Sequence, residues 1–152
     1  MTFLPTLSTA FYGPARRAVR ISMPAMKTKD LEWSIATEER YGFVDVTDEL
    51  QELVASSGVT DGRATVFSPS DTCPILVNER ESGLLRDIRR AVDRVTQSGD
   101  HSPPTTLGAK SVVFPVVDGR LRLGMWQRIL LFELDEPRER SVVVQIVGDR
   151  DE

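Results

Sequence analysis

Short runs that either alternate between apolar and polar residues or are mostly apolar recur along the chain, and they predict an antiparallel, strand-rich fold. In residues 31–37, Leu31, Trp33 and Ile35 share one face and polar side chains occupy the other. A strand with this pattern has one buried and one solvated face. The further runs that predict strands are residues 42–47, 64–67, 74–77, 112–117, 120–123, 129–134 and 142–147.

The last four of these runs follow one another closely and predict a meander. Asp118-Gly119 separates the first two, and this pair supplies the positive φ that a two-residue hairpin turn requires. No helical spacing interrupts residues 112–148, so we expect consecutive strands to pair antiparallel through short turns. This meander is the predicted spine of the domain.

A first helix is predicted over residues 47–58. Thr47 is placed to cap its start, Asp48 and Glu49 fall in its first turn, where the helix dipole favours acids, and Gly58 ends it. Its apolar stripe consists of Leu50, Leu53 and Val54.

A second, amphipathic helix is predicted over residues 83–96, because apolar residues repeat there at helical spacing. These residues are Leu84, Leu85, Ile88, Val92 and Val95. The element order predicts an α+β domain, in which an antiparallel sheet carries two main helices on one face.

The length of 152 residues is near the commonest size of a single domain. We expect one domain over residues 26–148, with an extension before it, residues 1–25, and an acidic tail after it, residues 149–152. The extension is basic and acid-free, which resembles a transit peptide; the alternative is a plain extension with the working start at Met26. Residues 97–106 are rich in Ser, Pro and Thr and are predicted to form a loop.

Charge and cysteine content narrow the function classes. The net charge of -4 is mild, and the arginines are dispersed among acids, so the sequence does not predict a nucleic-acid surface. No apolar run approaches the roughly 18 residues of a membrane-spanning helix. The single cysteine, Cys73, cannot form an internal disulfide, which fits a reducing compartment. We therefore expect a cytoplasmic protein without nucleic-acid or membrane partners.

The candidate chemistry lies in polar and aromatic residues near the ends of predicted strands, because no self-sufficient catalytic or metal motif occurs in the sequence. The carboxylate of Asn78-Glu79 is suited to binding a divalent cation or holding a proton; the alternative is an acid at a helix entrance. His101 would act as a ligand or general base, or is simply a solvated loop histidine. Trp126 would form a ligand platform, or belongs to the core.

Two further candidates have plain structural alternatives. Cys73 precedes a proline and an apolar strand, so a small buried side chain is favoured over a nucleophile. Arg120, Arg122 and Arg128 would suit a phosphate, yet alternate positions facing water explain the first two.

Four segments together resemble the YjbQ-like proteins, also called the secondary thiamine-phosphate synthase family. They are residues 42–50, Asn78-Glu79, the Gly-Arg-Leu-Arg-Leu-Gly-Met-Trp-Gln run at 119–127, and the closing strand at 142–148. The resemblance implies a compact α+β subunit, a homotrimer and a metal pocket built partly from histidine. It also implies a weak thiamine-phosphate synthase activity, which couples a pyrimidine pyrophosphate to a thiazole phosphate.

The chain departs from this family at positions that matter for the implied metal pocket. Ser70 stands where family members carry a histidine, and Ser82-Gly83 stands where an acid-proline pair is expected. The resemblance places His101 on the second family histidine. A site of His101, Glu79 and Asp71 would suit magnesium or manganese better than zinc, and the alternative is that no metal binds.

Two functional hypotheses follow from the resemblance. The first is a weak transferase in which Glu79 and His101 are the catalytic residues and the metal ligands. The second is a catalytically degenerate homotrimer that keeps the fold to bind a partner or ligand. The residues expected to bind a small phosphorylated substrate are Ser70, Asp71, Thr72, Asn78, Trp126, Gln127 and Arg128.

Overall fold

The computed structural model describes residues 26–97 and 107–149, which form two antiparallel sheets and two helices. The large sheet has the strand order β1-β8-β3-β5-β6 and the small sheet has the order β2-β7-β4. The strands of the large sheet are β1 (Lys27–Ala36), β8 (Glu139–Asp149), β3 (Asp61–Phe67), β5 (Ser111–Val117) and β6 (Arg120–Leu121). Those of the small sheet are β2 (Phe43–Asp45), β7 (Gln127–Phe132) and β4 (Ile75–Glu79). The predicted α+β class is confirmed.

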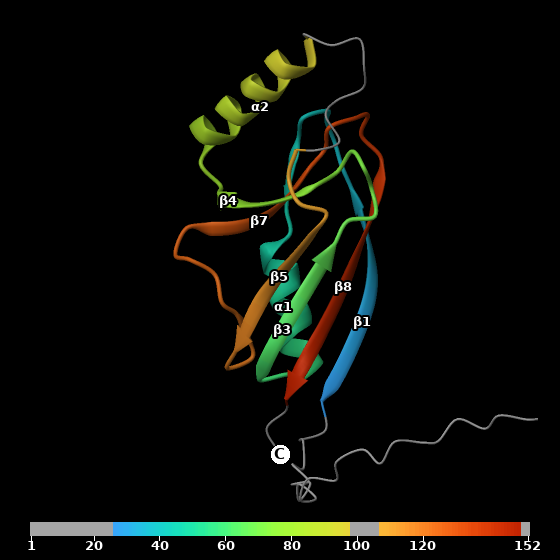
Figure 1. The fold of residues 1–152 in the computed structure, drawn as a ribbon, viewed down its shortest axis with the longest axis vertical. Coiled ribbons are helices and arrows are strands. Elements are labelled where there is room, and N and C mark those ends of the chain that lie inside the picture. The colour runs from blue at the N-terminus through green and yellow to red at the C-terminus, as the bar shows by residue number, and fades with distance from the viewer. Residues whose placement is uncertain (1–25, 98–106, 150–152) are drawn as a thin grey trace, which may run out of the picture.

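The two helices, α1 (Thr47–Ser57) and α2 (Ser82–Gln97), pack in different places. In Figure 1 the long strands of the large sheet stand side by side with α1 behind them, and α2 lies beyond β4 and β7. Leu50 and Val54 of α1 join the main core with the inner face of the large sheet. Val92 of α2 packs instead against Phe132 of the small sheet. The expectation that both helices cover one face of one sheet is therefore wrong.

Strand β7 is buried on both faces and forms the middle of the domain. Ile129 and Leu131 point into the main core, whereas Phe132, with Leu134 just after the strand, packs toward α2. An unbroken apolar run of this kind needs cover on both sides, which the middle layer provides. This requirement explains why the predicted meander is wrong in its pairing: β7 leaves the large sheet, and β8 lies between β1 and β3.

The turn predicted at Asp118-Gly119 and the helix end predicted at Gly58 agree with the structure, whereas the cap predicted at Thr47 does not. Asp118 and Gly119 have φ values of 50° and 69°, and the β5-β6 hairpin they join is confirmed. Gly58 ends α1 at a φ of 72°. Thr47, however, is the first residue of α1 and not its cap. Its hydroxyl donates to Asp45 and accepts from the backbone N–H of Ile129, which joins the helix start to β7.

Several sequence predictions concern residues at the ends of the described ranges or outside them. The extension over residues 1–25 and most of the 97–106 loop, including His101, lie outside the described residues. Asp149, expected in the acidic tail, is the last residue of β8. No helix in the described ranges is long and apolar enough to cross a membrane.

We expect Gly62→Ala to destabilise the fold, because β3 and β8 approach each other very closely at the Gly62–Gly148 pair. A Cβ at Gly62 would lie 2.1 Å from the carbonyl oxygen of Val147, a backbone atom that cannot move alone. The expected loss is about 1–3 kcal/mol in the free energy of unfolding by urea. Gly83→Ala is the control, because the added Cβ meets only the flexible Glu81 side chain and alanine favours a helix. Equal stability of both variants would contradict the close approach.

Candidate functional site

One group of predicted site residues meets at the end of the small sheet. Asn78 pairs with Arg128 and Glu79 pairs with Gln127 across the β4-β7 ladder. The Asn78 side chain accepts a hydrogen bond from the backbone N–H of Glu79. The Glu79 carboxylate is exposed and makes no hydrogen bond or ion pair with any residue that the structure describes. The structure thus brings four of the predicted residues together.

Arg128 is held in place by two acids, Asp45 at the end of β2 and Asp48 in the first turn of α1. Its Nε donates to Asp45 at 2.8 Å, and its Nη2 donates to Asp48 at 2.9 Å. Burial would raise the pKa of the Asp45 carboxyl, but hydrogen bonds from Arg128 and Thr47 outweigh that effect and hold the pKa below its usual value. The same two acids raise the pKa of Arg128. Arg80, which is largely exposed, also reaches Asp45, at 3.4 Å.

The helix-entrance role considered for Glu79 belongs to Glu81. The two carboxylate oxygens of Glu81 accept hydrogen bonds of 2.8 Å from the backbone N–H groups of Gly83 and Leu84. These bonds lower the pKa of Glu81, as expected for an acid at a helix N-terminus. Glu79 is therefore left without that structural role.

Trp126 lies on the exposed loop between β6 and β7, so its assignment to the core is wrong. Its side chain is 68% exposed, and Met125 beside it is 88% exposed. A hydrogen bond inside the loop fixes its shape, because the Gln127 side chain accepts it from the backbone N–H of Gly124 at 2.8 Å. The predicted role of Gln127 as a ligand residue stays a prediction, and its side chain already shapes this turn.

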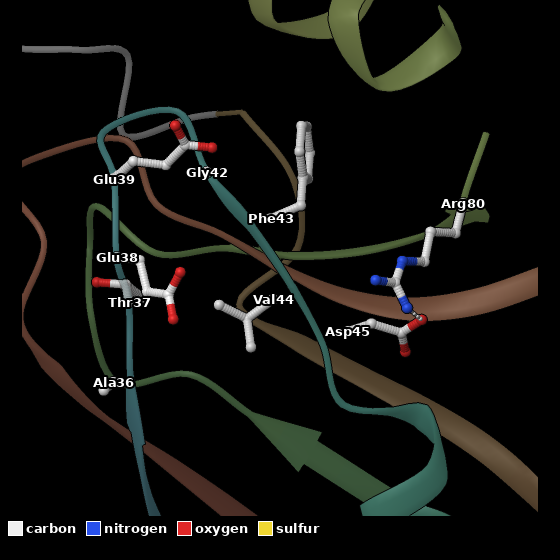
Figure 2. A pocket seen from close by; sticks show the side chains of 9 residues that line it. All are labelled: Ala36, Thr37, Glu38, Glu39, Gly42, Phe43, Val44, Asp45 and Arg80. Atoms are coloured by element: carbon white, nitrogen blue, oxygen red, sulfur yellow. Dashed lines mark hydrogen bonds and ion pairs between the residues drawn. The ribbon is translucent and has the colours of Figure 1, made fainter. Parts of the chain in front are cut away.

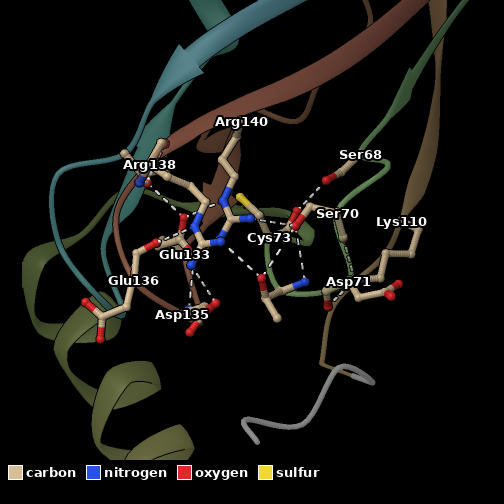
Figure 3. A network of polar contacts seen from close by, with 12 residues as sticks. Ser68, Ser70, Asp71, Cys73, Lys110, Glu133, Asp135, Glu136, Arg138 and Arg140 are labelled. Atoms are coloured by element: carbon tan, nitrogen blue, oxygen red, sulfur yellow. Dashed lines mark hydrogen bonds and ion pairs between the residues drawn. The ribbon is translucent and has the colours of Figure 1, made fainter.

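A second polar group surrounds a buried ion pair between Glu133 and Arg140 (Figure 3). Both side chains are almost completely buried. The guanidinium donates to both carboxylate oxygens, and Nε lies 2.7 Å from Oε2. Its remaining donors reach the hydroxyls of Ser70, at 3.0 Å, and Thr72, at 3.1 Å. Thr37 donates to the same carboxylate at 2.8 Å.

This network gives the Ser70 segment a structural role, because the hydroxyls of Ser70 and Thr72 accept hydrogen bonds from the buried Arg140. The ion pair is bidentate, and Glu133 accepts further bonds from the Thr37 hydroxyl and the backbone N–H of Asp135, so little of the buried charge is unpaired. Burial would raise the pKa of Glu133, but the bond from Arg140 and its other donors outweigh that effect and lower it.

The two groups lie at opposite ends of β4, so one chain does not bring all of the predicted residues together. Ser70, Asp71 and Thr72 precede the strand, whereas Asn78 and Glu79 end it. Five strand residues at about 3.3 Å each separate the ends by roughly 13 Å or more. The backbone carbonyls of Ser70 and Asp71 are held by the Lys110 ammonium. Ligand contacts by this segment stay a prediction.

Cys73 is fully buried beside the ion pair, which fits the structural reading of this residue. Burial raises the pKa of its thiol to about 11, and the nearby Glu133 carboxylate adds to the effect. A thiol of this kind is a poor nucleophile at neutral pH because it stays protonated.

A cavity of about 310 Å³ opens beside β2, and sequence reasoning missed it (Figure 2). Its lining residues are Ala36, Thr37, Glu38, Glu39, Gly42, Phe43, Val44, Asp45 and Arg80. In Figure 2 the Arg80 and Asp45 side chains meet on one side, and Glu38 and Glu39 lie on the other. No local pattern predicts it, because the cavity forms only when Arg80, which follows β4, packs against β2 in the folded chain.

The predicted metal site has no support in the described ranges. No three His, Cys, Asp or Glu side chains among residues 26–97 and 107–149 lie close enough to hold an ion. His101, the other predicted ligand, lies outside those ranges. The residues present do not make a metal centre with Glu79, and a site that includes His101 stays a prediction.

We expect Glu133→Gln to destabilise the fold by about 3–5 kcal/mol, because it leaves the Arg140 charge buried without its partner. Thermal and urea unfolding would measure the loss. Glu136→Gln, an exposed acid in the same connection, is the control. The double variant Glu133→Leu/Arg140→Met should lose less than Glu133→Gln, since no buried charge remains.

The same ion pair predicts the response to acid. Because the folded-state pKa of Glu133 is below its usual value of 4.5, its contribution is complete above about pH 4.5 and is lost as the pH falls toward the folded-state pKa. Glu133→Gln should therefore lose less stability than the parent between neutral and acidic pH. Parallel stability curves for the parent and this variant would contradict the assignment.

Comparison with known proteins places the whole described domain in one family. The family model described as "UPF0047 protein YjbQ-like" matches residues 31–149. A UPF0047 protein of Archaeoglobus fulgidus is 37% identical over 127 residues, which cover 76% of this chain and 98% of that protein. The UPF0047 protein YugU of Bacillus subtilis is 31% identical over 127 residues, which cover 75% of this chain and 96% of that protein.

A solved structure agrees with the sequence comparisons. A YbjQ-like protein of unknown function from Sulfolobus solfataricus superposes with a TM-score of 0.74 at 33% identity, and the match covers 82% of this chain and 100% of that one. The two-sheet arrangement, the matched range and the identities agree, and this chain belongs to the YjbQ-like UPF0047 family.

Proposed function

We propose that this chain is a ligand-binding member of the family, with its pocket at the cavity beside β2. The observation that carries the proposal is the cavity itself, where Arg80 and Asp45 meet next to the Asn78–Arg128 pair. A volume of about 310 Å³ is within the range of small-molecule sites. The pocket would be continuous with the sheet end that carries Glu79.

The charges around the cavity indicate the class of ligand. Arg80 offers an exposed guanidinium to a phosphate group, whereas Glu38 favours a cationic or amine-bearing part. Glu39 beside it is already paired with Arg89 at 2.7 Å. The proposed ligand is therefore a small phosphorylated molecule that also carries a positive group. Thiamine phosphate has both features, since its thiazolium ring is cationic and its pyrimidine carries an amino group.

A weak thiamine-phosphate-synthase-type transfer is the second candidate. The observation that favours it is the exposed Glu79 carboxylate, which neither the α2 entrance nor an ion pair in the described ranges uses. In this reading Glu79 and His101 are the catalytic residues. A divalent ion, Mg, Mn or Zn, stays a prediction that depends on His101. Trp126 remains a predicted ligand contact in both readings, whereas Ser70 and Thr72 lie at the opposite end of β4 and accept hydrogen bonds from Arg140.

Calorimetric titration with thiamine phosphate tests the binding proposal. We expect Arg80→Gln to weaken the affinity by about tenfold, because a hydrogen bond to a charged group contributes roughly 1.5–3 kcal/mol. Arg94→Gln, an exposed arginine in the last turn of α2, is the control and should bind like the parent. No heat of binding with the parent protein, with or without divalent ions, would overturn the proposal.

An activity assay on the same proteins separates the two candidates. The pyrimidine pyrophosphate and the thiazole phosphate would be supplied together, and pyrophosphate release would be measured. Release that disappears in Glu79→Gln supports the transferase, whereas binding without release in the parent supports the binding protein.

We also propose that the chain assembles as a homotrimer, which is what the resemblance implies. Support comes from apolar side chains on the outward face of the large sheet, where Phe67 is 41%, Val113 55% and Val117 39% exposed. Exposed apolar side chains on one face of a sheet are typical of association surfaces. The packing of the described residues leaves this face of β3 and β5 open.

Sedimentation should return a mass of about 51 kDa for the homotrimer, three times the 17.0 kDa of one chain. Val113→Asp should lower the mass, because it buries an unpaired charge at the interface. Ala55→Asp adds the same charge on the exposed side of α1 and should leave the mass unchanged. A parent protein with the mass of one chain would rule the trimer out.

A cytoplasmic location completes the proposal. The free thiol of Cys73 fits a reducing compartment, where structural disulfides are rare. Fractionation of the source cells would test this location.

A further inference from the structure

The loop between β6 and β7, residues 122–126, presents large apolar side chains to solvent although its own shape is fixed. Met125 is 88% exposed and Trp126 is 68% exposed. The backbone N–H of Arg122 donates to a carbonyl of β5 at 2.8 Å, and Leu123 packs against the main core. We call residues 122–126 the β6–β7 loop. Folding of one chain leaves its two most exposed apolar side chains unburied.

The β6–β7 loop also carries positive charge. Arg122 and, just before the loop, Arg120 are exposed, and neither makes an ion pair with another residue that the structure describes. The methionine side chain adapts to irregular apolar surfaces, and its sulfur makes favourable contacts with aromatic rings. A surface that complements this loop would therefore be apolar and aromatic, with an acidic rim.

A hollow with these properties lies between β1 and α1. It has a volume of about 360 Å³ and is lined by Leu31, Trp33, Glu49, Glu52, Leu53 and Ser56. The three apolar residues are only half-buried, and the two glutamates are exposed and make no ion pair within residues 26–97 and 107–149. Lys29 donates to Ser56 at 3.0 Å, so two acids face one base. We call this hollow the β1–α1 groove.

The loop and the groove belong to opposite edges of the large sheet. The strand order places β1 at one end of this five-stranded sheet and β6, which leads into the loop, at the other. With strands about 4.8 Å apart, the two edges are roughly 19 Å from each other. In Figure 1, β1 forms the right-hand side of the sheet, and the orange connection from β5 to β7 runs along the left.

A contact between the loop and the groove therefore requires a second copy, because the loop does not line the groove of its own chain. Such a contact joins two different surfaces, and three copies related by a three-fold axis can close it into a ring. Val113 and Val117, on the apolar face proposed above for the homotrimer, belong to β5, which is next to β6. That face and the β6–β7 loop thus lie toward the same edge of the sheet.

We propose that the β6–β7 loop of one copy docks into the β1–α1 groove of the next copy, an inference that rests on the proposed homotrimer. Met125 enters the groove against the Trp33 ring of the next copy, and Arg122 lies at the rim beside Glu49 and Glu52. The loop docks without rearrangement because its shape is already fixed, so little conformational entropy is lost. Each copy contributes one loop and one groove.

Sedimentation of Met125→Asp tests the apolar part of this contact. Met125 is exposed in a single chain, so the substitution leaves folding intact but would bury an unpaired charge in the groove. We expect the mass to fall from about 51 kDa for the homotrimer to the 17.0 kDa of one chain. Met125→Leu, which keeps the apolar volume, should keep the parent mass. Ala91→Asp adds the same charge on the exposed side of α2 and is the matched control.

An exchange of charges tests the rim of the groove. Arg122→Glu should lower the mass, because an acid would then face Glu49 and Glu52. Adding Glu49→Arg/Glu52→Arg in the same chain should restore the homotrimer, since each contact again joins opposite charges. A triple variant that stays at the mass of one chain would contradict the assigned rim.

Trp33 reports whether the groove is the docking site. In a Trp126→Phe background it is the remaining one of the two tryptophans, so acrylamide quenching measures its accessibility. We expect quenching to fall as the protein concentration rises and the homotrimer forms, and Met125→Asp to abolish this protection.

The other outcomes separate this inference from the proposals on which it builds. Assembly that leaves the quenching of Trp33 unchanged would overturn the inference, while the homotrimer would stand on a different contact. Protection of Trp33 at every concentration would also overturn it, because the occupant would then come from the same chain. A parent protein with the mass of one chain would overturn both the inference and the homotrimer. The ligand cavity is unaffected in each case, because Arg80 and Asp45 do not line the groove.

Discussion

The buried ion pair between Glu133 and Arg140 joins the two sheets and fixes the chain around it. Glu133 follows β7 of the small sheet, and Arg140 lies near the start of β8 in the large sheet. Removing two charges from water is costly, so such a pair is retained only when nearly every donor and acceptor is used. The hydroxyls of Ser70, Thr72 and Thr37 meet that requirement. The segment before β4, which contains Ser70 and Thr72, therefore supports the ion pair that joins the two sheets.

This commitment gives the two ends of β4 different roles. One end contributes hydroxyls to the interior, where an imidazole in place of Ser70 would meet the Arg140 guanidinium. The other end presents Asn78 and Glu79 toward solvent, beside the Arg128 side chain that two acids hold in place. The family fold is kept, while the polar residues on its strands divide between support and the proposed ligand contacts.

Local patterns in the sequence predicted which segments form strands and turns better than they predicted which strands pair with each other. Alternation identified β1, apolar runs identified β5 and β8, and the Asp118-Gly119 turn was correct because its backbone requirement is local. The place of β7 was missed, since an apolar run does not state which two layers cover it. The same limit applies to the site residues. Strand pairing places Asn78 beside Arg128, but the partner of Ser70 and the exposure of Trp126 depend on tertiary packing, which local patterns do not predict.

The deep burial of Cys73 has a practical consequence for spectroscopy on this domain. With its pKa near 11, roughly one thiol in ten thousand is ionised at neutral pH, and the sulfur is shielded from reagents as well. Maleimide dyes and nitroxide spin labels would therefore attach selectively to cysteines introduced on the surface. The native residue can stay in place during distance measurements, and the packing around the buried joint is left intact.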